Sequence, residues 1–167
     1  SNDGSLEYLR EQPDVRLFHT DTSYREGRSG VVWLNHLMNL FTAGWNVYVD
    51  VDEALVFPDI EVHGLRGLTD HMDRHGHDLA CGQMVDMFSM EAHQPSNDRF
   101  EDDFVSRYPF FSHEFERTQS LVCPYFFTVG GIRQLAGFGE NNTKTPLARG
   151  GREIQYLSSS HMVTPGV

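Results

Sequence analysis

An apolar run that ends in acidic residues constrains the fold of this 167-residue chain more than any other feature. Residues 45–52 read Trp-Asn-Val-Tyr-Val-Asp-Val-Asp, with an apolar centre and carboxylates at the end. A short run of this kind is typical of a central parallel strand that is buried on both faces. We therefore expect the carboxylates to lie at the carboxyl edge of a sheet, where α/β proteins bind their ligands.

Helical and extended segments alternate along the first 90 residues, which is typical of the α/β class. Helices are predicted by the spacing of apolar residues, and strands by β-rich composition and bounding turn residues. The predicted helices cover 4–11, 31–44, 65–76 and a short segment after Gly130-Gly131, and the predicted strands cover 15–19, 45–52, 79–90, 123–129, Leu147 and 154–157.

Composition is that of a folded, acidic protein. Hydrophobic residues make up 39% of the chain and aromatic residues 12%, which excludes a disordered chain. The net charge of −11 argues against a nucleic-acid-binding protein, because such a protein needs a basic face. No apolar run approaches the ~18 residues of a transmembrane helix. The two cysteines, Cys81 and Cys123, are predicted to be buried free thiols.

Three carboxylates gather at the end of the predicted strand: Asp50, Asp52 and Glu53. A strand would point the side chains of Asp50 and Asp52 to the same face. Two carboxylates together with diphosphate oxygens make a suitable ligand shell for Mg²⁺ or Mn²⁺. The alternative that the sequence leaves open is a solvated turn.

A second cluster of titratable residues lies between residues 70 and 78. His71 and His75 are four residues apart and share a helix face, which is zinc-ligand spacing, and His77 and Asp78 follow. However, Met72 stands where a zinc-protease motif requires Glu. A metal hydrolase built on His71, His75 and Asp78 is therefore a minor hypothesis beside a solvated helix face.

Cationic residues gather near the end of the chain. Lys144, Arg149 and Arg152 are followed by His161 in a sequence that is otherwise acidic. Cations beside a metal-bound diphosphate stabilise a leaving group that gains negative charge. Ordinary surface charge is the alternative.

Several short segments, in this order along the chain, resemble a bacterial glycosyltransferase family 2-like domain, of the subgroup that carries an Asp-x-Asp-Glu-x-Leu-Val motif. The resemblance covers nearly the whole chain. It implies a GT-A nucleotide-diphospho-sugar transferase-like fold, which is a Rossmann-like mixed sheet flanked by helices. The segments are Asp3-Gly4-Ser5, Val49-Asp50-Val51-Asp52-Glu53-Ala54-Leu55-Val56, Val85-Asp86-Met87-Phe88, Gly130-Gly131-Ile132-Arg133, Lys144-Thr145-Pro146-Leu147-Ala148-Arg149 and Ser160-His161.

The resemblance implies metal-dependent transfer of a sugar from a nucleotide-diphospho-sugar donor to a hydroxyl of a glycan or other acceptor, with inversion. The divalent cation, Mn²⁺ or Mg²⁺, would bind Asp50, Asp52 and His161, with Glu53 orienting the site. Asp52 is the stronger candidate for a direct ligand, and Asp50 is also a candidate for contact with the ribose. The implied donor-binding residues are Asp50, Arg133, Lys144 and Arg149.

Direct inversion needs one general base. The candidates are Asp86, on a predicted strand beside the metal, and Asp102 or Asp103, in the long segment 91–109. Asp86 is preferred because a strand positions a side chain more tightly than a loop. A polar residue that is only hydrogen-bonded at a strand end is the alternative for Asp86.

We expect a single glycosyltransferase-like domain over residues 1–167, with 1–90 as the nucleotide-sugar half and 91–167 as the acceptor half. Relative to the family pattern the chain starts inside the second motif, so the N-terminal strand–helix unit is expected to be missing. A truncated or non-catalytic sugar-nucleotide-binding domain is therefore the alternative function. The expected location is the cytoplasm, and a peripheral position at the inner membrane, where glycans are assembled, remains open.

Overall fold

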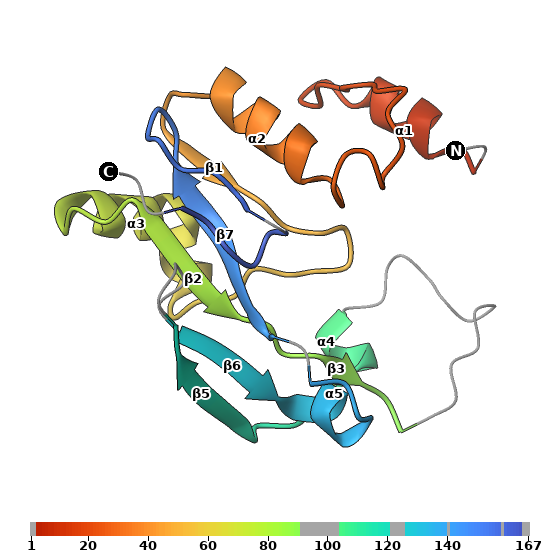
Figure 1. Ribbon diagram of the computed structural model, residues 1–167, viewed down its shortest axis with the longest axis vertical. Coiled ribbons are helices and arrows are strands. Elements are labelled where there is room, and N and C mark those ends of the chain that lie inside the picture. Colours follow the sequence, from red (N-terminus) through yellow and green to blue (C-terminus); the bar gives the residue numbers. More distant parts are fainter. Residues whose placement is uncertain (1–2, 91–103, 121–125, 140, 158, 165–167) are drawn as a thin grey trace.

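The computed structural model describes residues 3–90, 104–120, 126–139, 141–157 and 159–164. They form a mixed α/β structure with short helices and three small antiparallel sheets (Figure 1). The helices are α1 (Ser5–Glu11), α2 (Val31–Leu40), α3 (Ile60–Arg74), α4 (Phe104–Arg107) and α5 (Gly131–Leu135). The strands are β1 (Trp45–Val47), β2 (Leu79–Gln83), β3 (Met87–Phe88), β4 (Phe110–Phe111), β5 (Phe115–Gln119), β6 (Phe126–Gly130) and β7 (Thr143–Arg149).

The largest sheet has the order β1-β7-β2, and β7 is antiparallel to both neighbours. Residues 143–148 of β7 are all buried, although the strand contains Pro146, which has no N–H to donate. Proline in a sheet is found at bulges or edges. The pairing of β7 with β2 accordingly shifts register between Ala80 and Gly82, beside Pro146.

The structure corrects the prediction of a strand over residues 45–52. Within the described residues, β1 ends at Val47, lies at the edge of the sheet and pairs antiparallel with β7, so the prediction of a central parallel strand is wrong. The chain follows β7 for one more residue, since the Tyr48 N–H donates to the Pro146 carbonyl at 2.8 Å. It then turns at Val51 and Asp52, both exposed. An apolar run does not distinguish an edge strand from a central one, and the acidic residues favour the turn.

Other predicted elements match in part. Helices α1, α2, α3 and α5 and strands β2, β3, β6 and β7 overlap segments that the sequence predicts, whereas residues 15–19 form no strand. In the predicted strand 154–157 only Tyr156 pairs, through an isolated bridge to Val163. Cys81 is exposed, so its predicted burial is wrong, because β2 lies at the edge of its sheet. Cys123 lies outside the described residues.

A small core joins α2 to β7 and to the segment that follows it. Asn35 of α2 fixes that segment with two hydrogen bonds of 2.8 Å, because its side chain donates to the Tyr156 carbonyl and accepts from the Tyr156 N–H. The Tyr156 hydroxyl donates to the Thr145 carbonyl on β7 at 2.6 Å. The buried residues of this core are Val31, Met38, Ala148, Ile154, Tyr156 and Val163.

The sheets named above are antiparallel throughout, and the described part of the chain shows no Rossmann-like parallel sheet. The GT-A fold therefore stays a prediction from the resemblance. None of the helices formed by the described residues has the length and apolar character needed to cross a membrane.

Candidate functional site

The acidic residues 50–53 form a tight turn, which we call the acidic turn. The Glu53 N–H donates to the Asp50 carbonyl at 3.0 Å, and the Asp50 N–H donates to the Glu53 carboxylate at 3.0 Å. These reciprocal contacts bring the side chains of Asp50 and Glu53 to the same side. Asp52 is exposed, and because it lies in a turn it does not share a strand face with Asp50.

Lys144 of β7 lies against the acidic turn. Its ammonium group donates to Asp50 Oδ2 at 2.6 Å and to both oxygens of Glu53, at 2.6 and 2.5 Å. The remaining oxygen, Asp50 Oδ1, accepts from the Tyr48 hydroxyl at 2.9 Å. We call these four residues the lysine–carboxylate cluster. Every carboxylate oxygen in it has a donor supplied by this chain.

The cluster is unusual for the burial of its cation. Lys144 is the only lysine in the sequence, and its side chain is 6% exposed, against 49% for Asp50 and 22% for Glu53. A buried lysine requires paired carboxylates, because desolvation of an unpaired charge is strongly unfavourable. The ring of Tyr48 adds a cation–π contact, with its centroid 5.2 Å from Lys144 Nζ.

The electrostatics of the cluster favour an ionised Asp50. Burial acts to raise the pKa of Asp50, but hydrogen bonds from Lys144 and Tyr48 and the positive charges of Lys144 and His161 lower it below its ordinary value overall. Burial, together with the hydrogen bond to Asp50, raises the pKa of Tyr48. The Tyr48 hydroxyl therefore keeps its proton and acts as a donor.

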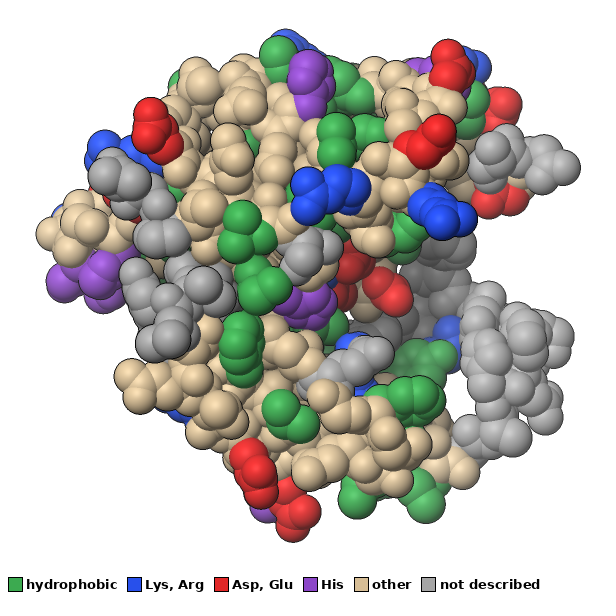
Figure 2. Space-filling view, in the orientation of Figure 1, with side chains coloured by type: hydrophobic (Ala, Val, Ile, Leu, Met, Phe, Trp, Pro, Cys, Tyr) green, Lys and Arg blue, Asp and Glu red, His purple; other side chains and the backbone are tan. Residues whose placement is uncertain are grey.

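His161 is hydrogen-bonded to the residue that precedes Lys144 on β7, and it is close enough for a positive charge on its ring to act on Asp50. Its Nδ1 is 2.6 Å from the Thr143 carbonyl oxygen, which can only accept, so Nδ1 carries the proton. Nε2 is then the nitrogen available to a ligand, the arrangement that ligand-binding histidines commonly use. On the face shown in Figure 2, side chains coloured as histidine and as Asp or Glu are neighbours near the middle of the molecule.

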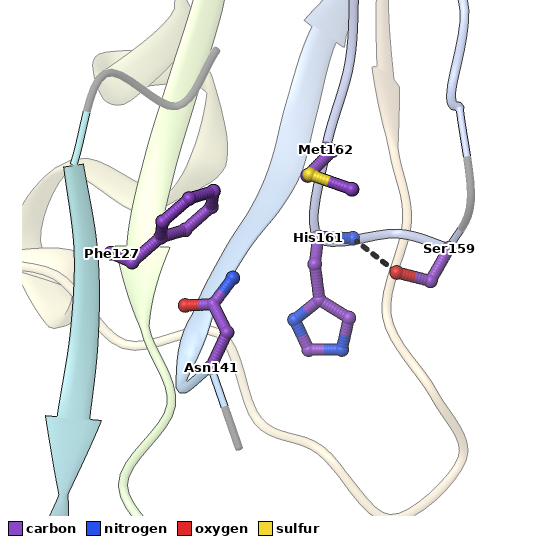
Figure 3. Close-up of a pocket in the computed structure, with 5 residues that line it drawn as sticks. All are labelled: Phe127, Asn141, Ser159, His161 and Met162. Atoms are coloured by element: carbon purple, nitrogen blue, oxygen red, sulfur yellow. Dashed lines mark hydrogen bonds between the residues drawn. The ribbon is translucent and has the colours of Figure 1, made fainter. Parts of the chain in front are cut away.

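A cavity of about 320 Å³ opens beside the His161 ring. Figure 3 shows the imidazole facing the same space as Asn141, with Phe127 of β6 on the opposite wall. Ser159 accepts a hydrogen bond from the His161 N–H at 3.2 Å, and Met162 completes the lining. The wall thus combines an aromatic ring with amide and hydroxyl groups. A larger hollow of about 640 Å³ lies elsewhere, between α2 and residues 151–155.

The donor set does not fit a divalent cation as it is arranged. In the part of the chain that the structure describes, no three His, Cys, Asp or Glu side chains are placed to hold a metal ion. The Lys144 ammonium group lies where a cation bridging Asp50 and Glu53 would lie, and Asp52 is turned to solvent. Of the implied ligands, the structure brings Asp50 and His161 near each other and leaves Asp52 apart.

Asp86 is paired with Arg133 of α5. The guanidinium donates from Nε to Asp86 Oδ2 at 2.6 Å and from a terminal nitrogen to Oδ1 at 2.7 Å, a bidentate geometry. The pair joins the segment between β2 and β3 to α5, and both side chains are about a quarter to a third exposed. Asp86, the preferred candidate for the general base, and Arg133, an implied donor-binding residue, thus form one ion pair. Asp102 and Asp103 lie outside the described residues.

Arg149 lies at the far end of β7 from Lys144, about 16 Å away by strand geometry. It pairs with Asp73 of α3 and, at 3.2 Å, with Asp78, and its guanidinium lies 5.2 Å from the Trp45 ring centroid. Arg149 therefore ties α3 to the sheet and is not part of the lysine–carboxylate cluster.

The residues of the hydrolase hypothesis have other contacts. Asp78 forms ion pairs with both Arg149 and Arg152, at 3.2 and 3.3 Å. His71 and His75 are exposed, with ring centroids 4.2 Å apart, and His75 Nδ1 is bound to the His71 carbonyl at 2.8 Å. Nothing among the described contacts supports a metal site here.

Sequence reasoning missed the roles of Tyr48, Phe127 and Asn141. Tyr48 lay inside a run interpreted as apolar, and its hydroxyl gave no separate signal. Phe127 and Asn141 belong to segments whose meeting depends on how the sheets are arranged.

Comparison of the chain with protein-family models, with curated proteins and with solved structures found no match.

Proposed function

We propose that the chain is the donor-binding part of a glycosyltransferase, which transfers a sugar from a nucleotide-diphospho-sugar to an acceptor hydroxyl with inversion. One observation carries the proposal. Asp50 with Glu53, Lys144 and His161 come from three segments that are far apart in the sequence and that the resemblance singles out independently. The supporting contacts are the hydrogen bonds of Lys144 to Asp50 and Glu53, and the hydrogen bond of the His161 ring to the carbonyl of Thr143, the neighbour of Lys144.

The chemistry of the meeting point suits a diphosphate and a sugar. Lys144 supplies a positive charge and His161 a ring nitrogen beside the cavity, and charge stabilisation of the departing diphosphate is the main requirement of this reaction. The cavity beside His161 offers Phe127 for stacking on a sugar ring and Asn141 and Ser159 for hydrogen bonds to hydroxyl groups. This cavity is the proposed position of the transferred sugar.

The proposal routes no step through a metal ion, because Lys144 lies where the implied cation would bridge Asp50 and Glu53. For the general base, Asp86, Asp102 and Asp103 remain candidates. Asp86 must leave or share its bidentate contact with Arg133 to accept a proton. That requirement makes Arg133 part of any role of Asp86 in catalysis.

The test is a panel of nucleoside diphosphates and their sugars, titrated calorimetrically and assayed for released nucleoside diphosphate, with Mn²⁺, with Mg²⁺ and with chelator. We expect saturable binding of one donor class in the wild type and a loss of about 100-fold or more in turnover in Asp50→Asn. The matched control is Asp70→Asn, an exposed carboxylate on α3. Equal activity of Asp50→Asn and wild type would reject the proposal.

A non-catalytic sugar-nucleotide-binding domain is the second candidate. The observation that favours it is the complete occupation of the four carboxylate oxygens by donors of this chain. Saturable donor binding without any transfer or donor hydrolysis, under all three cation conditions, would select this candidate over the enzyme.

A further inference from the structure

The carboxylates of Asp50 and Glu53 are arranged as if around a cation, and the cation present is Lys144. Three of their four oxygens lie within 2.6 Å of Lys144 Nζ. The fourth oxygen, on Asp50, accepts from the Tyr48 hydroxyl. A metal ion that bridges the two side chains must therefore remove contacts that already exist.

Burial makes Lys144 hard to displace. Its side chain is 6% exposed on the central strand β7, whereas the two carboxylates are partly open to solvent. Water can reach the acidic turn, but the ammonium group has no comparable access. A cation arriving from solvent approaches the carboxylates on the side away from Lys144 and is repelled by its charge at short range.

We propose that Lys144 is the built-in counter-cation of the acidic turn, so that divalent cations bind this turn only in competition with its ammonium group. The inference rests on the proposed function only in taking the acidic turn as part of the donor site. Its test measures cation binding and lysine reactivity, not sugar transfer, so the two proposals can fail separately.

The first experiment is titration with Mn²⁺, followed by the paramagnetic resonance signal of the free ion. Lys144→Met should bind Mn²⁺ at least about tenfold more tightly than the wild type, because the competing charge is gone. Arg16→Met is the matched control, since it removes one positive charge at an exposed position far from the turn in sequence, and it should bind as the wild type does. Equal affinity of Lys144→Met and wild type, or no binding by either, overturns the proposal.

The second experiment uses the wild type alone and keeps the proposal falsifiable if Lys144→Met does not fold. Because Lys144 is the only lysine, reductive dimethylation read by mass spectrometry reports on this one side chain, separately from the chain's amino terminus. We expect slow modification without metal and an increase of about tenfold at Mn²⁺ concentrations that saturate binding, since displacement frees the nitrogen. An unchanged rate at saturating Mn²⁺ overturns the proposal.

Discussion

The contact between Lys144 and Glu53 gives the most direct test of the site in terms of stability. The perturbation is a double-mutant cycle with Lys144→Met, Glu53→Gln and the two together. Lys144→Met keeps most of the side-chain length but leaves two carboxylates facing each other without a cation. Glu53→Gln keeps the shape of its side chain, removes its negative charge and replaces one of its two acceptor oxygens near Lys144 Nζ with an NH2 group.

The expected magnitude follows from the exposure of each partner. Removing one partner of a fully buried ion pair destabilises a protein by about 3–5 kcal/mol, whereas exposed pairs contribute about 0–1 kcal/mol. Lys144 is buried, but Glu53 is 22% exposed and Asp50 is 49% exposed. We therefore expect each single substitution to lower the free energy of unfolding by about 2 kcal/mol, between those limits.

The double variant should lose less than the sum of the two single losses, because its two substitutions remove the same contact. A coupling of about 1–2 kcal/mol is expected. The assay is urea unfolding at pH 7 followed by circular dichroism, with thermal unfolding as a second measurement. A loss of 2 kcal/mol corresponds to a fall in melting temperature of about 4–8 °C for a chain of this length.

The control cycle pairs Lys144→Met with Asp70→Asn, a carboxylate on the exposed surface of α3. Those two substitutions should be additive within about 0.5 kcal/mol. If Lys144→Met and Glu53→Gln are equally additive, the ammonium–carboxylate contact does not hold the acidic turn, and the reasoning about the site is refuted.

Three further predictions concern other contacts. The pKa of Asp50 is lowered in the folded protein, so its contribution to stability is present above the ordinary carboxyl pKa and is lost as pH falls through the lower folded value. The difference in unfolding free energy between wild type and Asp50→Asn should therefore shrink only below pH ~4. Asp86→Asn and Arg133→Met should each lose about 1 kcal/mol by urea unfolding and show no additivity when combined, and full additivity would refute a single bidentate pair. Gly130→Ala should lose about 2–3 kcal/mol of unfolding free energy by the same measurement, because the new Cβ would lie 2.2 Å from the Glu114 carbonyl oxygen. Gly139→Ala, with open space around it, should change the stability little, and equal losses in the two variants would refute the steric argument.

Helical spacing predicted most of the helices because it is a local signal. The apolar positions of α2 repeat within ten residues and need no information about the rest of the chain. The strands were predicted less well because pairing depends on distant segments. The apolar run that begins at Trp45 looked central, but β7 holds the central place with a polar and proline-containing sequence that no periodicity test would select.

At the acidic turn, too, local features were predictable from the sequence and contacts between distant segments were not. The sequence singled out Asp50 and Glu53 at the end of a predicted strand and Lys144 and His161 near the end of the chain, and the structure brings Asp50, Glu53 and Lys144 into direct contact. It could not tell which cation Asp50 and Glu53 face, because Lys144 is 94 residues from Asp50 along the chain. A local rule for carboxylates after a strand predicts a cation there and does not identify that cation as part of the chain.

The contacts that build the site also hold the edge of the sheet. After β1 ends at Val47, the chain stays beside β7 through the hydrogen bond from Tyr48 to Pro146 and through the hydrogen bonds from Lys144 to the acidic turn. A buried lysine in a central strand is tolerated only because this turn folds over it. A ligand that draws Lys144 or its carboxylates into new contacts therefore acts directly on the packing of β1 against β7. Binding at the site and stability of this edge are consequently linked through the same four side chains.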